Sequence, residues 1–205
     1  MAVALTQADL DAIRDAVIAA ETTTSGEIFV AVAAESDSYR IVPVVWAAVI
    51  ALVVPLPLIW LTPLSAALIY AIQLAVFIVA IGILSLPEVK ALIVPERLKA
   101  EQTRALAVQQ FLAHGLHRTE TRTGVLIFAS LAERRAEIVA DAGIDGRVAE
   151  GTWERVVAGI VSHAKAGNLA PGLVKAVQDC GRELAIHFPP GRLNRDELPN
   201  EVVIL

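Results

Sequence analysis

Charged residues are absent from one long stretch of the sequence: no Asp, Glu, Lys, Arg or His occurs from Ile41 to Pro87. About 20 apolar residues cross the hydrocarbon core of a bilayer, so this stretch of 47 residues is long enough for two helices. The polar break at residues 61–65 predicts a tight turn between them. We therefore predict a transmembrane hairpin with helices near residues 42–60 and 64–86, which makes the lipid bilayer a partner of the chain.

Two prolines, Pro55 and Pro57, fall inside the first predicted helix. Each removes a backbone donor, and a break at this point would leave residues 41–54 too short to cross, as a re-entrant segment. We favour the full hairpin, because neighbouring helices can satisfy the backbone of a kinked span.

Positive charges flank the uncharged stretch at Arg40, Lys90, Arg97 and Lys99, whereas the predicted turn has none. The positive-inside rule then places the soluble parts and both termini in the cytoplasm. The amino-terminal residues lack the basic start and apolar core of a signal peptide. Cysteine is nearly absent as well: the single Cys180 excludes an intramolecular disulfide and is consistent with a reducing compartment.

Other absences narrow the function. The net charge is −5 and the only basic doublet is Arg134-Arg135, so we expect no nucleic-acid partner. The glycine loop at residues 141–146 lacks the Lys-Ser/Thr pair of a P-loop, so we expect no nucleotide cofactor. No Gly-x-Ser-x-Gly or Cys-x-x-Cys motif occurs, and no complete catalytic constellation is visible.

The remaining residues, about 155 in number, suffice for one domain. Apolar runs and helical stripes predict helices from Thr6 and Pro95, strands at residues 27–33, 123–130 and 135–140, a helix near residues 153–164 and a last helix from Pro171. This order predicts an α/β fold: a small mixed β-sheet flanked by helices and interrupted by the two-helix transmembrane hairpin. The expected parts are residues 1–40 and 88–190 for the α/β domain, 41–87 for the hairpin, and 191–205 for a C-terminal tail with an edge strand.

A long crossover joins the first two strands and a short turn joins the next two, so we expect a parallel and then an antiparallel pair. The start of strands one and two and the end of strand three then share one sheet edge. Carboxylates and imidazoles gather there, which are ligands of divalent metal ions. We predict a metal site formed from Glu27, Asp141, Asp145, His114, His117 and Glu120, beside Thr123.

Each of these residues also has a purely structural interpretation. Histidines such as His114 and His117 are favoured near a helix C-terminus by the macrodipole. Asp141 and Asp145 flank glycines and could serve only to form a turn. Glu27 could cap a loop. We expect Cys180, on the apolar side of a predicted helix, to be a buried structural thiol.

The block from Gly124 to Val139, with its turn Glu133-Arg134-Arg135, and the following Asp-Ala-Gly-Ile-Asp-Gly loop resemble the core of the TPM domain family. The segment Thr24-Ser-Gly-Glu-Ile-Phe-Val resembles the first strand of that family. The inserted hairpin is similar to that of a bacterial subgroup of predicted membrane proteins, which implies an integral protein of the bacterial inner membrane. The resemblance further implies acid phosphatase activity and calcium binding, which are reported for some members, with Asp141 and Asp145 in the loop where members place acidic residues.

Three function classes follow. We favour a membrane-anchored TPM-like module that binds a metal ion or a protein partner, or a second copy of itself, in membrane-protein maintenance. The first alternative is a metal-assisted acid phosphatase, in which Glu27, Asp141 and Asp145 hold a cation that polarises a phosphoryl group. The second is a structural subunit that assembles through the hairpin or through residues 201–205 as an added strand.

Overall fold

The structure of the chain is a computed structural model that describes residues 5–119, 121–190 and 199–205. It divides into two compact units. The first contains the described residues up to Ser36 and from Ala100 onward, and the second is Asp37–Lys99.

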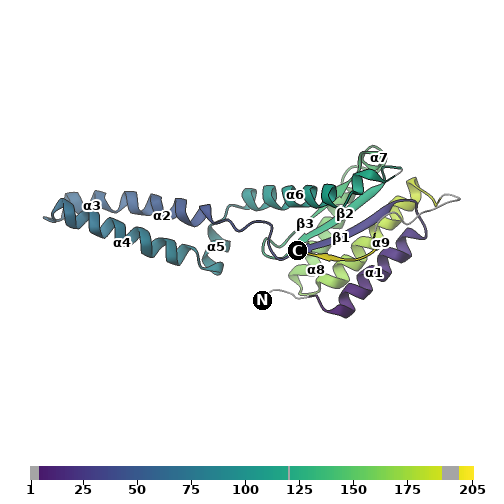
Figure 1. Cartoon of the computed structure of the whole chain (residues 1–205), viewed down its shortest axis with the longest axis horizontal. Coiled ribbons are helices and arrows are strands. Elements are labelled where there is room, and N and C mark those ends of the chain that lie inside the picture. Colours follow the sequence, from purple (N-terminus) through teal and green to yellow (C-terminus); the bar gives the residue numbers. More distant parts are fainter. Residues whose placement is uncertain (1–4, 120, 191–198) are drawn as a thin grey trace. The chain divides into compact units, whose positions relative to one another are not determined.

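The first unit is built on a mixed sheet with the strand order β3-β2-β1-β4 (Figure 1). β1 pairs with β2 in parallel, with Glu27 opposite Gly124, and β2 pairs with β3 antiparallel, with Ser130 opposite Arg135. The predicted parallel and antiparallel pairs are therefore confirmed. The C-terminal tail adds its short strand in parallel to the free side of β1, within the chain's own sheet. The strands are β1 (Glu27–Ala33), β2 (Gly124–Ser130), β3 (Arg135–Ala140) and β4 (Val203–Ile204).

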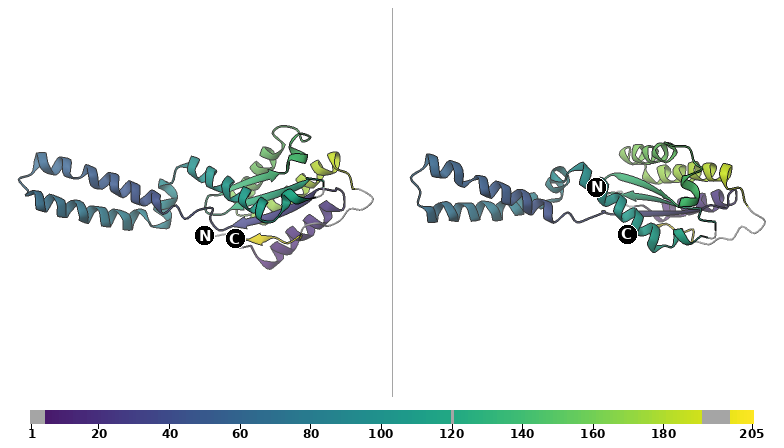
Figure 2. Two further views of the ribbon diagram at one scale, coloured as in Figure 1. Left: turned by 45° about the horizontal axis from the view of Figure 1, so that its top comes forward. Right: turned by 90° about the horizontal axis from the view of Figure 1, so that it is seen from above.

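Helices cover both faces of this sheet, and Figure 2 shows α6 on the face opposite to α8 and α9. Side chains alternate between the faces along a strand, so Ile28, Val30 and Val32 enter the core under α1, α8 and α9, whereas Phe29 and Ala31 pack under α6. The predicted α/β fold with a mixed sheet flanked by helices is confirmed. The helices of this unit are α1 (Gln7–Glu21), α6 (Glu96–Ala113), the 3-10 helix η1 (Leu116–Arg118), α7 (Ala142–Asp145), α8 (Thr152–Lys165) and α9 (Leu169–His187).

Local signals set the ends of these helices. The Thr6 hydroxyl accepts a hydrogen bond from the Asp9 N–H, and the Asp9 carboxylate accepts one from the Thr6 N–H, which is the predicted capping box at the start of α1. Gly115 follows α6 with a φ of 73°, a left-handed conformation that glycine adopts without strain. Cys180 is completely buried in α9, which confirms it as a structural thiol.

The second unit contains α2 (Ile41–Val53), α3 (Pro55–Leu61), α4 (Ala66–Leu84) and α5 (Pro87–Ile93). Val54 keeps helical torsions, φ −55° and ψ −40°, and its N–H still donates to the Ile50 carbonyl at 3.2 Å. α2 and α3 therefore form one helical segment of 21 residues that continues past Pro55 and Pro57. This segment and α4 are each long and apolar enough to cross a membrane, with mean hydropathies of 2.5 and 2.6.

Small side chains form the contact between α2 and α4. Ala47 and Ala51, one turn apart on α2, are buried, and Ile69 of α4 is buried with them. Alanine lets two helix backbones approach closely, which is the main source of helix association in lipid. The surrounding side chains are large, apolar and exposed, so the hairpin presents an apolar surface on its outer faces.

Candidate functional site

The strand pairing brings Glu27, Thr123 and Asp141 to one end of the sheet, as predicted. The Glu27 N–H donates to the Thr123 carbonyl at 3.2 Å, and the Asp141 N–H donates to the Gly124 carbonyl at 2.9 Å. All three residues are buried: Glu27 is 4% exposed, Asp141 5% and Thr123 not at all. We call this set of three the acidic edge. It places two buried carboxylates at the same end of the sheet, with β2 between the strand of Glu27 and the strand that Asp141 follows.

Asp141 combines a structural role with one uncommitted oxygen. Its Oδ1 accepts the Ala142 N–H at 2.6 Å as the N-cap of α7 and lies 3.6 Å from Nη1 of Arg122. Its Oδ2 is buried and has no hydrogen-bond partner among the described residues. The loop after it packs tightly, because a Cβ on Gly143 would lie 2.4 Å from the Arg122 carbonyl oxygen. The turn-forming interpretation of Asp141 is therefore correct for one oxygen and leaves the other available.

Hydroxyl groups lie around this edge, and sequence reasoning identified only Thr123 among them. The Thr121 and Thr123 hydroxyls lie 2.6 Å apart, and Thr123 donates to the Ser25 carbonyl at 3.1 Å. The Thr119 hydroxyl accepts the Thr123 N–H at 3.1 Å. The alternation Thr-x-Thr-x-Thr at residues 119–123 is the sequence signal that could have revealed this cluster.

The two histidines lie on the α6 side of the sheet. The ring of His114 stacks near Phe29, with 4.5 Å between ring centroids. His117 lies in η1, and its Nδ1 is buried without a hydrogen-bond partner in the part of the chain that the structure describes. Both positions follow the C-terminal end of α6, where the macrodipole also favours histidine.

The structure describes the side chains of only some of the six predicted metal ligands. Glu120 and the side chain of Asp145 lie outside the described residues. Among the side chains that are described, no group of three or more His, Cys, Asp or Glu residues converges as metal ligands would. Metal binding at the acidic edge therefore stays a prediction, and its strongest support is the uncommitted Oδ2 of Asp141.

The opposite end of the sheet is organised by Glu133, in the turn between β2 and β3. Its carboxylate accepts the Ser36 N–H, at 3.0 Å to Oε1 and 3.2 Å to Oε2, and the Ser130 hydroxyl. The Ser36 hydroxyl in turn contacts the Thr103 hydroxyl of α6 at 3.3 Å. Sequence reasoning assigned Glu133 only to a family motif, whereas the structure gives it a buried hydrogen-bonding role between the two strand ends.

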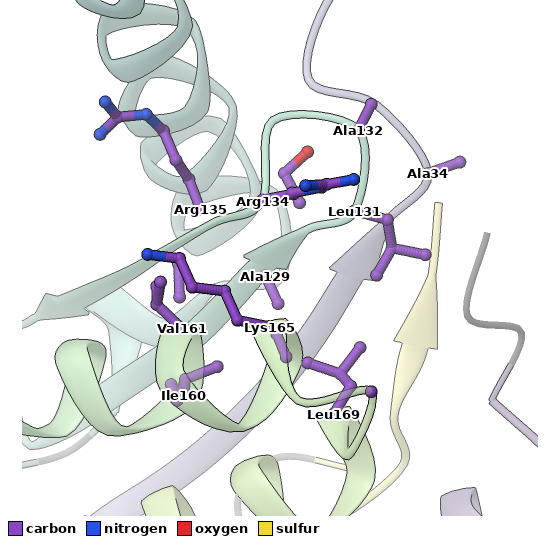
Figure 3. A pocket seen from close by; sticks show the side chains of 14 residues that line it. Ala34, Ala129, Leu131, Ala132, Arg134, Arg135, Ile160, Val161, Lys165 and Leu169 are labelled. Atoms are coloured by element: carbon purple, nitrogen blue, oxygen red, sulfur yellow. The ribbon is translucent and has the colours of Figure 1, made fainter. Parts of the chain in front are cut away.

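A pocket of about 510 Å³ opens beside this turn (Figure 3). Arg134 and Lys165 line it together with alanine, leucine and isoleucine side chains. Arg135 pairs with Ser130, so Arg134 and Arg135 lie at the end of the sheet opposite to Asp141. The pocket therefore lies at the end of the sheet away from the acidic edge.

Comparisons with known proteins agree with this architecture. The TPM domain matches residues 87–183 of the chain, and no curated protein matches it. The NMR structure of the BA42 protein from the psychrophilic bacterium Bizionia argentinensis is similar in fold, with a TM-score of 0.62 and 22% sequence identity over 98% of this chain and 94% of that one. At this identity the likeness concerns the fold alone. Residues 87–183 therefore match the TPM domain, the family that the strand–turn–strand motif resembles.

Proposed function

We propose that this chain is a membrane-anchored binding module. The hairpin inserts into a bilayer, and the TPM domain binds a divalent cation or a partner protein in membrane-protein maintenance. The observation that carries the anchoring is the exposed apolar surface of the hairpin: only 11% of each candidate span is buried.

The side chains on that surface are too apolar to be left in water. Ile41, Trp60 and Leu61 are 75%, 84% and 80% exposed. Covering one such side chain gains about 1.5–3 kcal/mol. A bilayer supplies that cover along the whole length of both helices, which supports membrane insertion.

The proposed topology follows from charge. Arg40 and Lys90 lie at the two ends of the hairpin, and no charge occurs between them except Glu88. The positive-inside rule supports a cytoplasmic location for these ends, with the turn at residues 62–65 on the far side of the inner membrane. In this topology the TPM domain works from the cytoplasm.

Engineered cysteines test this topology cleanly, because Cys180 is buried and burial raises the pKa of its thiol, which keeps it unreactive. We compare Pro63→Cys in the turn with Gln7→Cys on the exposed face of α1, both expressed in a bacterium. In cells with a permeabilised outer membrane, a maleimide that cannot cross the inner membrane should label Pro63→Cys and leave Gln7→Cys unlabelled until the cells are lysed. Labelling of Gln7→Cys before lysis contradicts the orientation, and recovery of the chain in the soluble fraction contradicts the anchor.

The proposed cation site uses Asp141, with Glu27 at the same end of the sheet on the other side of β2. Asp141→Asn removes the charge at this position and keeps the helix cap. Asparagine caps a helix as well as aspartate does, so its side-chain oxygen still accepts the hydrogen bond from the Ala142 N–H. A bound cation at 100 times its Kd stabilises the native state by about 2.7 kcal/mol. We therefore expect calcium, magnesium or manganese to raise the melting temperature of the wild-type chain and of the surface control Asp15→Asn, but not of Asp141→Asn.

The same pair of variants separates the two functions that involve a metal. Cation-dependent hydrolysis of p-nitrophenyl phosphate that disappears in Asp141→Asn would favour the phosphatase alternative. A cation-dependent rise in stability without hydrolysis favours the binding module. An equal rise in wild type and Asp141→Asn contradicts a cation site at this residue.

A further inference from the structure

The pocket beside the β2–β3 turn has a cationic rim that the acidic edge does not share. Arg134 comes from the turn and Lys165 from the last turn of α8, and both line the pocket. Figure 3 shows Arg134 crossing the turn and Lys165 running along the α8 side, with Ala129 between them and Ile160 and Leu169 below. The pocket therefore joins two positive side chains to an apolar floor.

These two cations carry uncompensated charge. Among the described residues neither Arg134 nor Lys165 makes an ion pair, and the carboxylate nearest in sequence, Glu133, is used by Ser36 and Ser130. Arg135 contributes less to the rim. Its side chain alternates to the α6 face, as that of Glu137 does, and Figure 3 shows it directed away from Lys165.

The backbone at Arg134 supports a functional reason for the arginine. Its φ is 53°, in the left-handed region that costs a non-glycine residue about 1–2 kcal/mol. Glycine would occupy this position without that cost. A strained residue that keeps a long cationic side chain at a pocket rim points to a role in binding rather than in stability.

The dimensions and lining select the ligand class. A volume of about 510 Å³ lies within the usual range of small-molecule sites. The floor is built from small or aliphatic side chains, including Ala129, Ala164 and Leu169, which suit a short alkyl chain. Arginine and lysine head groups suit an oxyanion, and arginine can hold one through two parallel hydrogen bonds.

We propose that this pocket binds a small amphipathic anion. Its oxyanion head, a carboxylate or a phosphate, lies between Arg134 and Lys165, and its alkyl chain lies on the floor formed by Ala129, Ile160 and Leu169. The site is at the opposite end of the sheet from Asp141 and requires neither a cation nor the proposed anchoring.

Calorimetric titration of the full chain in neutral phosphatidylcholine nanodiscs tests the proposal. The probes are hexanoate, hexyl phosphate and hexanol, which share the chain and differ in the head group. We expect one or both anions to bind at least about tenfold more tightly than hexanol, because a hydrogen bond to a charged group contributes roughly that factor. The tighter of the two anions identifies the head group. Binding of hexanol as tightly as both anions, or of no probe at all, overturns the proposal.

Three variants and a control assign the binding to this pocket. Arg134→Gly should keep or raise the melting temperature, because it relieves the left-handed strain, and should still weaken anion binding about tenfold or more. Lys165→Gln should weaken anion binding similarly, and Ala164→Leu should weaken binding of all probes by filling the pocket. Lys175→Gln, on the exposed face of α9, should leave every affinity unchanged. Unchanged anion affinity in a folded Arg134→Gly chain, or equal losses in Lys175→Gln, overturns the assignment.

Discussion

Replacing Glu133 by alanine tests whether one buried carboxylate holds the turn end of the sheet together. The side chain is 7% exposed and accepts hydrogen bonds from the Ser36 N–H and the Ser130 hydroxyl. A buried donor left without a partner costs about 1–3 kcal/mol. The Ser130 hydroxyl can rotate toward another acceptor, whereas the Ser36 N–H is fixed by the backbone. We therefore expect Glu133→Ala to lower the free energy of unfolding by about 1–3 kcal/mol.

Glu137→Ala is a matched control, because Glu137 lies four residues further on and is only partly buried. Its ion pair with Arg104, at 3.2 Å, involves a largely exposed arginine and is worth at most about 1 kcal/mol. Unfolding in urea can be followed in detergent by the fluorescence of Trp153 on α8, with Trp46 and Trp60 of the hairpin replaced by phenylalanine. A loss in Glu133→Ala no larger than in Glu137→Ala would refute the reasoning.

Three further predictions concern packing and pH. Gly124→Ala should destabilise the sheet by about 1–3 kcal/mol in a urea melt, because its Cβ would lie 2.5 Å from the Leu116 carbonyl oxygen. The control Gly159→Ala, in open space on α8, should be neutral or slightly stabilising. Ala47→Leu should separate α2 from α4 and lower the melting temperature reported by Trp46 fluorescence, whereas Val49→Leu on the exposed side should not. The hydrogen bonds from Thr6 lower the pKa of Asp9. The stabilisation of α1 by the Asp9 carboxylate is therefore present near neutral pH and disappears as the pH falls through that lowered pKa. A pH titration of helicity by circular dichroism should show this acid step in wild type and not in Asp9→Asn.

The main sheet was predictable because its signals are local. Apart from its first residue, Glu27, β1 is a continuous apolar run, and β3 follows a four-residue turn that permits only an antiparallel return. The parallel pairing of β1 and β2 followed from the long connection between them. From these pairings the sequence alone also predicted that Asp141 lies at the same end of the sheet as Glu27 and Thr123, which the structure shows.

The features that escaped prediction depend on contacts distant in sequence. Nothing in the sequence around Glu133 indicates that its carboxylate accepts a hydrogen bond from the N–H of Ser36, 97 residues earlier. The pocket beside Arg134 exists because α8 brings Lys165 to the start of β3, a helix-to-strand contact that no motif encodes. The positive φ of Arg122 and Arg134 is set by tight turns, and the residue type at each position gives no sign of it.

The position of the hairpin in the sequence is consistent with the way the sheet is built. Two parallel strands cannot be joined by a tight turn, so the connection between β1 and β2 must leave the sheet in any case. An insertion in that connection interrupts no strand ladder and needs only a fixed point where the chain leaves β1. Glu133 provides that point. It lies in the turn after β2 and accepts a hydrogen bond from the N–H of Ser36, which is the last residue before the second unit begins. The buried carboxylate thereby ties the point where the chain leaves β1 to the β2–β3 turn, which gives the charged residue in this buried turn a structural role.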